Sequence, residues 1–376
     1  MRTVLLAGAF GQGNPGDEAH LEAFIRHLDG WDVAATTSDP RATERDHACR
    51  AVPRGDAAEV AREASRSDGV VFAGGTVFKL LHPSARRPSH DLLRRALVLA
   101  AGARLLGKPV CMLGVGAGHL DGAMARLLVR AVAQRAALLV LRDEESAALL
   151  AAAGVRPPFR IGTDPAWALF EKPPTRTARG DDVIVALSHL AGRNGLAPYV
   201  IAALTPLVSA GLSVKLQPWQ SLERGGDDPL AHDIAAALGT EIIEPPRDLI
   251  AARDLYASSR LVVGLRFHAS MAAAAAGTPF VTFGHEPKLI ALARRLGQRC
   301  VRPDDPPFEL TTAIREAVMG LGPHHAAVEE EIGCAKQGFD LLRLLLDGPD
   351  GIQPEDVEGL TLAPSPATRG SGDRRT

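Results

Sequence analysis

Residues 261–288 contain one complete strand–helix–strand unit, and this unit restricts the chain to a small group of folds. The unit begins with a short apolar run at residues 261–263, which is typical of a strand buried on both faces. An alanine-rich segment at residues 270–276 ends at Gly277, and a second apolar run covers residues 280–283. Two successive strands that are joined by a helix lie parallel in a sheet. The pattern therefore predicts a parallel sheet covered by helices.

The same alternation of apolar runs and helical segments recurs along most of the chain, with a break near the middle. We therefore predict an α/β protein with two Rossmann-like domains, each built on a parallel sheet. The expected strands are residues 3–7, 33–36, 69–72, 109–113 and 138–141 in the first domain and 183–188, 213–217, 241–243, 261–263 and 280–283 in the second.

Composition places the boundaries between these parts. A segment rich in Pro, Arg and Gly predicts a linker, an amphipathic segment near the end predicts a long helix, and Pro, Gly, Ser and charge after it predict disorder. The expected organisation is an N-terminal domain at residues 1–172, a linker at 173–182, a C-terminal domain at 183–322, a helix at 323–347 and a disordered tail at 348–376.

The overall composition excludes several classes of protein. A net charge of −2 and only two Tyr and three Trp residues argue against a nucleic-acid-binding protein. The apolar stretches carry arginines and are too short for a transmembrane segment. We expect a cytoplasmic protein that meets any lipid-linked substrate at the inner membrane surface.

Arg266 and His268 follow the strand at residues 261–263 and precede the alanine-rich helix. Ligands of open α/β sheets bind beyond the carboxyl ends of the strands, where the N-termini of helices favour anions. Lys288 follows the next strand, and Arg142 follows a strand of the first domain, where it marks either a binding site or an ordinary helix start. We therefore predict an anion-binding site at this edge, whereas we expect Asp164 to be structural.

The loop at residues 8–16 contains four glycines and is followed by Asp17 and Glu18. Its spacing differs from the dinucleotide-binding fingerprint, and two carboxylates at a helix start would repel a pyrophosphate. The two acidic residues either stabilise the helix dipole or, together with Asn14, face the cleft and bind sugar hydroxyls. The spacing leaves both interpretations open.

These motifs together resemble the polysaccharide pyruvyl transferase family. The resemblance rests on eight short segments that occur in the order typical of the family, over roughly residues 3–296: GNPGDEA, AGGT, GVGAG, LRDEES, TDPAW, GLRFH, AGTP and HEPK. It implies a glycosyltransferase-B-like fold, in which the two domains face each other across a cleft. It also implies that phosphoenolpyruvate is the donor and a saccharide, free or lipid-linked, is the acceptor in the biosynthesis of cell-surface polysaccharides, exopolysaccharides or the cell wall.

The expected site residues fall into three groups. Those expected to act in catalysis are His268, Asp17 and Glu18. Those expected to bind the donor are Arg266, Phe267, Arg142 and Lys288. Those expected to bind the acceptor are Asn14, Gly16, Gly75, His285 and Glu286.

The residue types suit the formation of a pyruvate ketal on two sugar hydroxyls. Arginine and lysine bind the carboxylate and the phosphate of the donor, and a histidine that titrates near neutrality can protonate its methylene carbon. Asp17, Glu18 or Glu286 would accept the hydroxyl proton. We expect neither a metal nor a cofactor apart from phosphoenolpyruvate as co-substrate. The alternatives are a nucleotide-sugar-dependent glycosyltransferase or epimerase, in which Arg266 would bind a diphosphate, and a non-catalytic saccharide-binding protein.

Overall fold

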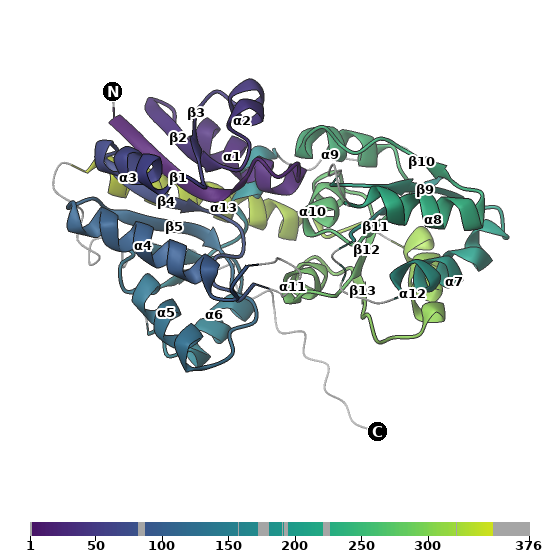
Figure 1. Cartoon of the computed structure of the whole chain (residues 1–376). Coiled ribbons are helices and arrows are strands. Elements are labelled where there is room, and N and C mark those ends of the chain that lie inside the picture. Colours follow the sequence, from purple (N-terminus) through teal and green to yellow (C-terminus); the bar gives the residue numbers. More distant parts are fainter. Residues whose placement is uncertain are drawn as a thin grey trace.

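The computed structural model describes residues 2–81, 87–156, 158–171, 180–189, 191, 195–220, 226–320 and 322–348. The chain forms two sheets, in which all paired strands run parallel, and they lie side by side with helices around them (Figure 1). The first sheet has the order β3-β2-β1-β4-β5-β6-β7, with strands β1 (Arg2–Phe10), β2 (Trp31–Thr37), β3 (Arg50–Pro53), β4 (Gly69–Ala73), β5 (Val110–Val115), β6 (Leu138–Leu141) and β7 (Arg160–Ile161). The second has the order β10-β9-β8-β11-β12-β13, with strands β8 (Asp182–Ala186), β9 (Ser213–Gln217), β10 (Glu241–Ile242), β11 (Leu261–Gly264), β12 (Phe280–Phe283) and β13 (Arg299–Val301).

Helices cover both faces of each sheet, as crossover connections between parallel strands require. In the first half these are α1 (Pro15–His27), α2 (Pro40–Asp46), α3 (Ala57–Arg66), α4 (Asp91–Leu105), α5 (Ala123–Ala133), α6 (Glu144–Ala152) and the short 3₁₀ helix η2 (Pro165–Leu169). In the second half they are α7 (Leu196–Val208), α8 (Asp228–Leu238), α9 (Leu249–Ala257), α10 (Phe267–Ala275), α11 (Pro287–Arg295) and α12 (Pro307–Met319), and α13 (His325–Asp347) follows. The predicted fold class, two α/β domains on parallel sheets, is confirmed.

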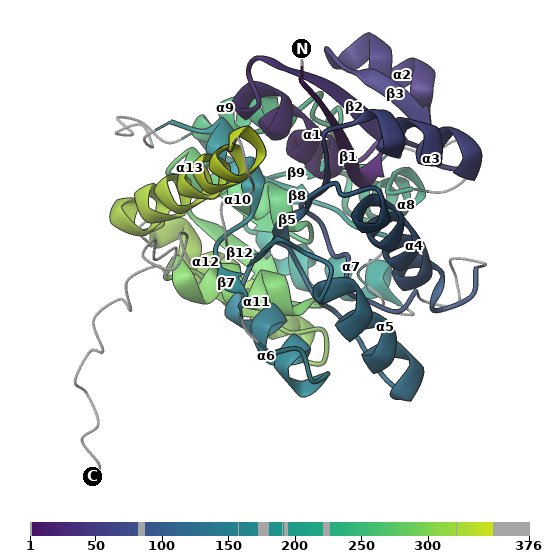
Figure 2. The same ribbon diagram turned by 90° about the vertical axis from the view of Figure 1, so that its left-hand side faces the viewer.

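One apolar cluster is shared by the two halves. It contains buried residues of α1, η2 and α13 together with residues of α9, α10 and α11. The helix α13 starts in the second half and packs back against η2 and β5 of the first, as Figures 1 and 2 show. The start of β1 and the last turn of α13 are also in contact, because the guanidinium of Arg2 donates a hydrogen bond to the carbonyl of Leu346. The two halves therefore fold around a common core and hold the carboxyl edges of their sheets toward each other.

Several elements differ from the sequence-based expectation. The elements α2, β3, α11, β13 and α12 were not predicted, because their apolar residues are few or are interrupted by charges. The helix expected at residues 270–276 already begins at Phe267, so that Arg266 is its N-cap residue and His268 lies in its first turn. Most of the expected linker and all but the first residue of the expected tail lie outside the described residues, and the predicted domain boundaries stay predictions. None of the described helices combines the length and the hydropathy that a bilayer-spanning segment needs.

The glycine-rich loop between β1 and α1 is closed by its own side chains. Asn14 caps α1 by accepting from the amide of Gly16, and the Glu18 carboxylate accepts from the amide of Gly11 at 2.8 Å. The second Glu18 oxygen lies 3.2 Å from Nε2 of His47. Burial alone would lower the pKa of His47, but hydrogen bonds and charges from Glu18 and Glu22 raise it to about 9. Glu18 thus closes the loop through contacts that neither sequence-based interpretation included, and its expected catalytic role stays a prediction.

The His47 contact predicts a pH-dependent contribution to stability. The folded-state pKa of His47 lies above its ordinary value of 6.5, so its contribution is fully present below that value and disappears as the pH rises through about 9. We expect His47→Leu to lower the free energy of unfolding by about 2 kcal/mol near pH 6, because the partners are partly exposed and screened, and by much less above pH 9. Urea denaturation at both pH values measures this. His119→Leu is the control, since His119 makes an exposed pair with Asp121; an equal loss at both pH values in His47→Leu would contradict the assignment.

Candidate active site

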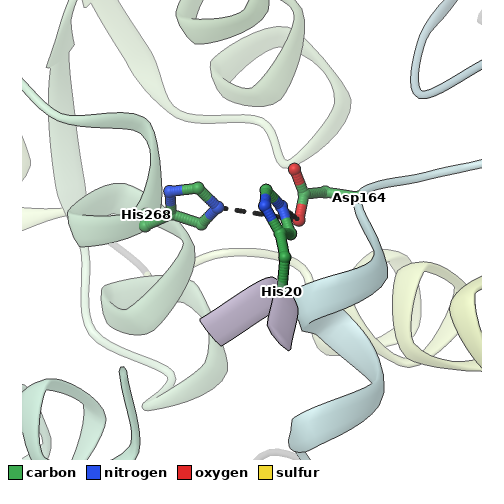
Figure 3. Close-up of side chains that lie close together, drawn as sticks. All are labelled: His20, Asp164 and His268. Carbon is green, nitrogen blue, oxygen red and sulfur yellow. Dashed lines mark hydrogen bonds and ion pairs between the residues drawn. The ribbon is translucent and has the colours of Figure 1, made fainter. Parts of the chain in front are cut away.

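Two histidines and one aspartate meet where the halves touch. His20 projects from α1, Asp164 caps η2, and His268 comes from the first turn of α10 (Figure 3). Nε2 of His20 lies 2.8 Å from Oδ1 of Asp164, and Nε2 of His268 lies 3.6 Å from the same oxygen. The two imidazole rings meet edge to face, with their centroids 5.1 Å apart. One carboxylate of the first half therefore serves a histidine from each half.

Burial makes the charges in this group strongly interdependent. Asp164 is completely buried. Burial alone would raise the pKa of its carboxyl, but the charge and hydrogen bond of His20 and the nearby His268 hold that pKa well below its usual value. Burial also lowers the pKa of His268, a change that Asp164 opposes and the charge of His20 reinforces. Among the described residues, Nε2 of His268 and Oδ2 of Asp164 are buried polar atoms without a hydrogen-bond partner, as is common for groups that act on a substrate.

Glycines allow this approach of the two halves. A Cβ atom at Gly16 would lie 1.9 Å from Nδ1 of His268, so any side chain there would displace the imidazole. A Cβ atom at Gly74 would lie 2.8 Å from the ring of His20, and Gly74 also has a positive φ of 65°. The glycines of the N-terminal motifs are thus explained by close packing against histidines.

The same three side chains are the group in the described residues that resembles a metal site. Their donor atoms all lie within 4.8 Å of one another. The guanidinium of Arg142 lies 3.7 Å from Oδ2 of Asp164, and His268 lies in the first turn of α10, at the positive end of that helix. These positive charges oppose a cation. The arrangement suits a shared proton better than a divalent metal.

A small cavity lies between the two halves. Both halves and α13 contribute to its lining, which consists of Arg142, Asp143, Thr163, Trp167, Phe267, Lys288, Ala291, Leu292, Arg295 and Glu331. Thr163 and Phe267 are the chain neighbours of Asp164 and His268, so the cavity lies close to the three-residue group. Its three cationic side chains suit an anion.

The ring of Phe267 organises two of these cations. The guanidinium carbon of Arg142 lies 5.3 Å from the ring centroid, and Nζ of Lys288 lies 6.0 Å from it. Gly116 leaves room for the guanidinium, because a Cβ atom there would lie 2.4 Å from it. Burial and the charge of Lys288 lower the pKa of Lys79, and Arg142 adds to the effect. Lys79 therefore belongs to the same concentration of positive charge.

Acidic residues balance part of this charge. Lys288 forms an ion pair with Glu286 at 2.6 Å, and Arg295 forms one with the buried Glu331 at 2.7 Å. Burial alone would raise the pKa of Glu286, but Lys288 lowers it to about 2. A carboxylate with so low a pKa is a weak general base.

Arg266 lies in a different environment from the one expected. Its guanidinium donates to both carboxylate oxygens of Asp227 at 2.8 Å and to the carbonyl of Leu187 at 3.3 Å. Asp227 also accepts from the amides of Trp219 and Gln220. In the described part of the chain no contact joins Arg266 to Arg142. Arg266 organises the loops at the carboxyl edge of the second sheet, and its expected contact with the donor stays a prediction.

Asp17, which was expected to act in catalysis, and the residues expected to bind the acceptor follow the carboxyl ends of strands in the two sheets. Asp17 is half-buried and accepts from the Asn14 amide at 2.7 Å, and its charge raises the pKa of His268. A Cβ atom at Gly75 would meet nothing within 4 Å, so this glycine borders open space. His285 is half-buried and contacts the carbonyl of Phe283 through Nδ1. Their roles toward an acceptor stay predictions.

Sequence analysis missed four side chains of this region: His20, Lys79, Arg295 and Asp227. His20 and Lys79 stand one and three residues beyond motifs that were noticed, and the search at strand ends did not extend into the following turns. Arg295 and Asp227 lie in segments without a distinctive motif. Asp164 was expected to be structural; it does cap η2, but it also contacts both histidines.

Several solved structures share this fold. The UDP-GlcNAc 2-epimerase from Methanocaldococcus jannaschii has a TM-score of 0.61 at 13% identity, with 93% of this chain and 100% of that chain covered. Anabaena Alr3699/HepE, solved in complex with UDP-glucose, has a TM-score of 0.59 at 14% identity, with 96% and 100% covered. At such identities the likeness shows the fold alone, a glycosyltransferase-B-like arrangement.

The sequence itself gives a more specific assignment. No curated protein sequence matches the chain significantly. A family model described as "Polysaccharide pyruvyl transferase" matches residues 14–287, which include His20, Asp164, His268, Arg142 and Lys79, whereas Lys288 and Arg295 lie beyond the matched segment. The chain belongs to the polysaccharide pyruvyl transferase family.

Proposed function

We propose that the protein transfers the enolpyruvyl group of phosphoenolpyruvate onto two hydroxyls of a saccharide and so forms a pyruvate ketal. The observation that carries this proposal is the cavity lined by Arg142, Lys288 and Arg295, because their positive charges suit a donor with a carboxylate and a phosphate. The reaction would take place in the cytoplasm, in the biosynthesis of a cell-surface or extracellular polysaccharide.

The proposed chemistry begins with the donor in the cavity. Arg142 and Lys288 would bind its two anionic groups, with Phe267 between them and Arg295 and Lys79 adding positive charge. His268 would protonate the methylene carbon while a sugar hydroxyl attacks C2 and loses its proton to a base. Asp17 is the candidate for that base, since Glu18 is held by Gly11 and His47 and Glu286 by Lys288. The C2–O bond to phosphate then breaks, and a second hydroxyl closes the ketal with loss of its proton.

Within this scheme, Asp164 and His20 are positioning residues for His268. Asp164 favours a proton on the imidazole of His268, and a protonated His20 competes for the same carboxylate. Because of this competition, the pKa of His268 is lower than it would be if His268 alone paired with Asp164. His268 is therefore a stronger acid.

The shared fold also supports a second candidate function. The structural neighbours include proteins solved with UDP-GlcNAc and with UDP-glucose, so a nucleotide-sugar-dependent glycosyltransferase or epimerase is the alternative. A non-catalytic saccharide-binding protein is the third. Binding of phosphoenolpyruvate or of a nucleotide sugar distinguishes the pyruvyl transferase from the nucleotide-sugar enzyme. Release of phosphate from phosphoenolpyruvate distinguishes the pyruvyl transferase from a non-catalytic saccharide-binding protein.

The donor site predicts selective binding of phosphoenolpyruvate. We expect isothermal titration calorimetry to show that Lys288→Met binds phosphoenolpyruvate about 10- to 100-fold more weakly, because one charge-assisted hydrogen bond is lost. Lys215→Met is the matched control, because Lys215 also pairs with two carboxylates but lies on β9 away from the cavity. Tight binding of a UDP-sugar without binding of phosphoenolpyruvate would instead support the alternative.

The acid role predicts the effect of His268→Ala. Loss of a positioned general acid should reduce phosphate release in the presence of acceptor by about 100- to 10,000-fold. Circular dichroism and the melting temperature report whether the variant still folds, and His119→Ala is the control for an exposed histidine. Turnover close to that of the unmodified protein would refute the acid role.

The competition for Asp164 predicts a shifted pH profile in His20→Gln. Glutamine can still donate to Asp164 but carries no charge, so the pKa of His268 should rise. A general acid acts only while protonated, so the basic limb of the kcat–pH profile should move to higher pH. Asp17, Arg142 and Asp143, the other charged groups around His268 and Asp164, remain in this variant. A purely structural role of His20 would lower activity at all pH values without moving the limb.

A further inference from the structure

The outer surface of α4 and α5 exposes large apolar side chains. Val98, Leu105 and Leu106 on or directly after α4 and Met124 and Leu127 on α5 are between 49% and 88% exposed. They are five of the nine exposed large apolar side chains found among the described residues. We call this surface the α4–α5 face. Such a concentration on two neighbouring helices is unusual for a surface that only meets water.

The α4–α5 face is not needed for the core of the first half. The opposite sides of the same helices supply the buried residues that pack on the sheet, namely Leu93, Ala96, Ala100, Ala103, Ala125, Leu128, Val129 and Val132. The two helices pack against each other and lie side by side at the outside of the molecule in both views (Figures 1 and 2). Each helix therefore has two apolar sides, and only one of them has a partner.

Positive charge is concentrated on the same segment. Residues 91–141 contain seven Arg and Lys residues and two acidic residues, although the whole chain has a net charge of −2. Arg94, Arg104, Arg126 and Arg130 are exposed on the two helices. Both acidic residues are paired, Asp91 with Arg95 and Asp121 with His119. The two helices thus carry exposed arginines as well as exposed apolar side chains.

The combination of exposed aliphatic side chains and arginines decides which kind of partner fits the α4–α5 face. A second copy of the chain, related by a two-fold axis, would bring arginines against arginines. A nucleic acid would match the charge, but the face offers aliphatic side chains and no aromatic ones for stacking. An anionic bilayer matches both features, since aliphatic side chains enter the interface and arginines bind the headgroups.

We propose that the α4–α5 face docks the protein onto the surface of an anionic phospholipid membrane. Both helices follow strands of the first sheet, so their N-terminal ends lie at the carboxyl edge that also carries Gly75 and Gly116. Met124 and Leu127, in the first turns of α5, lie near this edge, whereas Leu105 and Leu106 lie at the C-terminal end of α4. A protein docked through the first turns of α5 therefore holds the edge with the candidate site near the bilayer. The docking does not depend on the reaction proposed above.

Vesicle sedimentation of the full chain tests this proposal. One set of vesicles is phosphatidylcholine alone, and the other is an equal mixture with phosphatidylglycerol. We expect binding to the mixed vesicles that weakens with salt, and little binding to phosphatidylcholine. The variant R104Q/R126Q/R130Q should bind the mixed vesicles about 100-fold more weakly, and L105S/M124S/L127S at least about 10-fold more weakly.

The matched control is F308S/M319S, which removes two exposed apolar side chains from α12 in the other half. We expect it to bind vesicles as the unmodified chain does, and all three variants to keep their melting temperature. Equal binding to both kinds of vesicle, or an equal loss in the α12 control, would overturn the proposal. So would a dimer in light scattering that L105S/M124S/L127S converts to a monomer, because the face would then bind a second copy.

Discussion

The contact between Asp164 of the first half and His268 of the second is the interaction on which the candidate site depends. It exists only because the apolar cluster shared by α1, η2, α13 and α9–α11 fixes the two halves at short distance, and because Gly16 leaves space for the imidazole. A completely buried carboxylate is costly unless it is paired. His20 supplies one partner permanently, so His268 is left with a longer contact of 3.6 Å and a buried, unpartnered Nε2. Asp164 thus holds the imidazole of His268 in place without a hydrogen bond to its Nε2. A histidine in this state is suited to donate a proton to a substrate.

The cations near this contact differ in how far their charge is already compensated. Arg266 is bound by both oxygens of Asp227, whose pKa is about 2 although burial alone would raise it. Arg142 faces Asp143 at 3.1 Å and Asp164 at 3.7 Å, but it also lies over Phe267 and lines the cavity. The presence of an arginine in a sequence motif therefore does not show whether its guanidinium is available to an anion. Its availability depends on the carboxylates that already pair with it.

The sequence predicted the fold well in segments where one hydrophobic pattern, that of a buried strand or that of a helix, dominates. The runs at residues 261–263 and 280–283 became β11 and β12, and the glycine motifs at strand ends became the loops of the two facing edges. It failed where structure comes from contacts distant in the chain. Nothing near His20 indicates that it would meet Asp164, which is 144 residues away, and nothing near Arg266 announces Asp227. Asp164 was expected to be structural and does cap η2, whereas its contact with two histidines depends on the packing of both halves.

The geometry combines a small cationic cavity, a histidine with a free buried nitrogen and a half-buried aspartate in one interface. The measurement that tests this account most directly is mass spectrometry of saccharides incubated with the protein and carbon-13-labelled phosphoenolpyruvate. The account predicts a saccharide that gains the mass of a labelled pyruvate ketal, together with one released phosphate for each ketal formed. Absence of the label from every saccharide, combined with transfer of a sugar from a nucleotide donor, would contradict it.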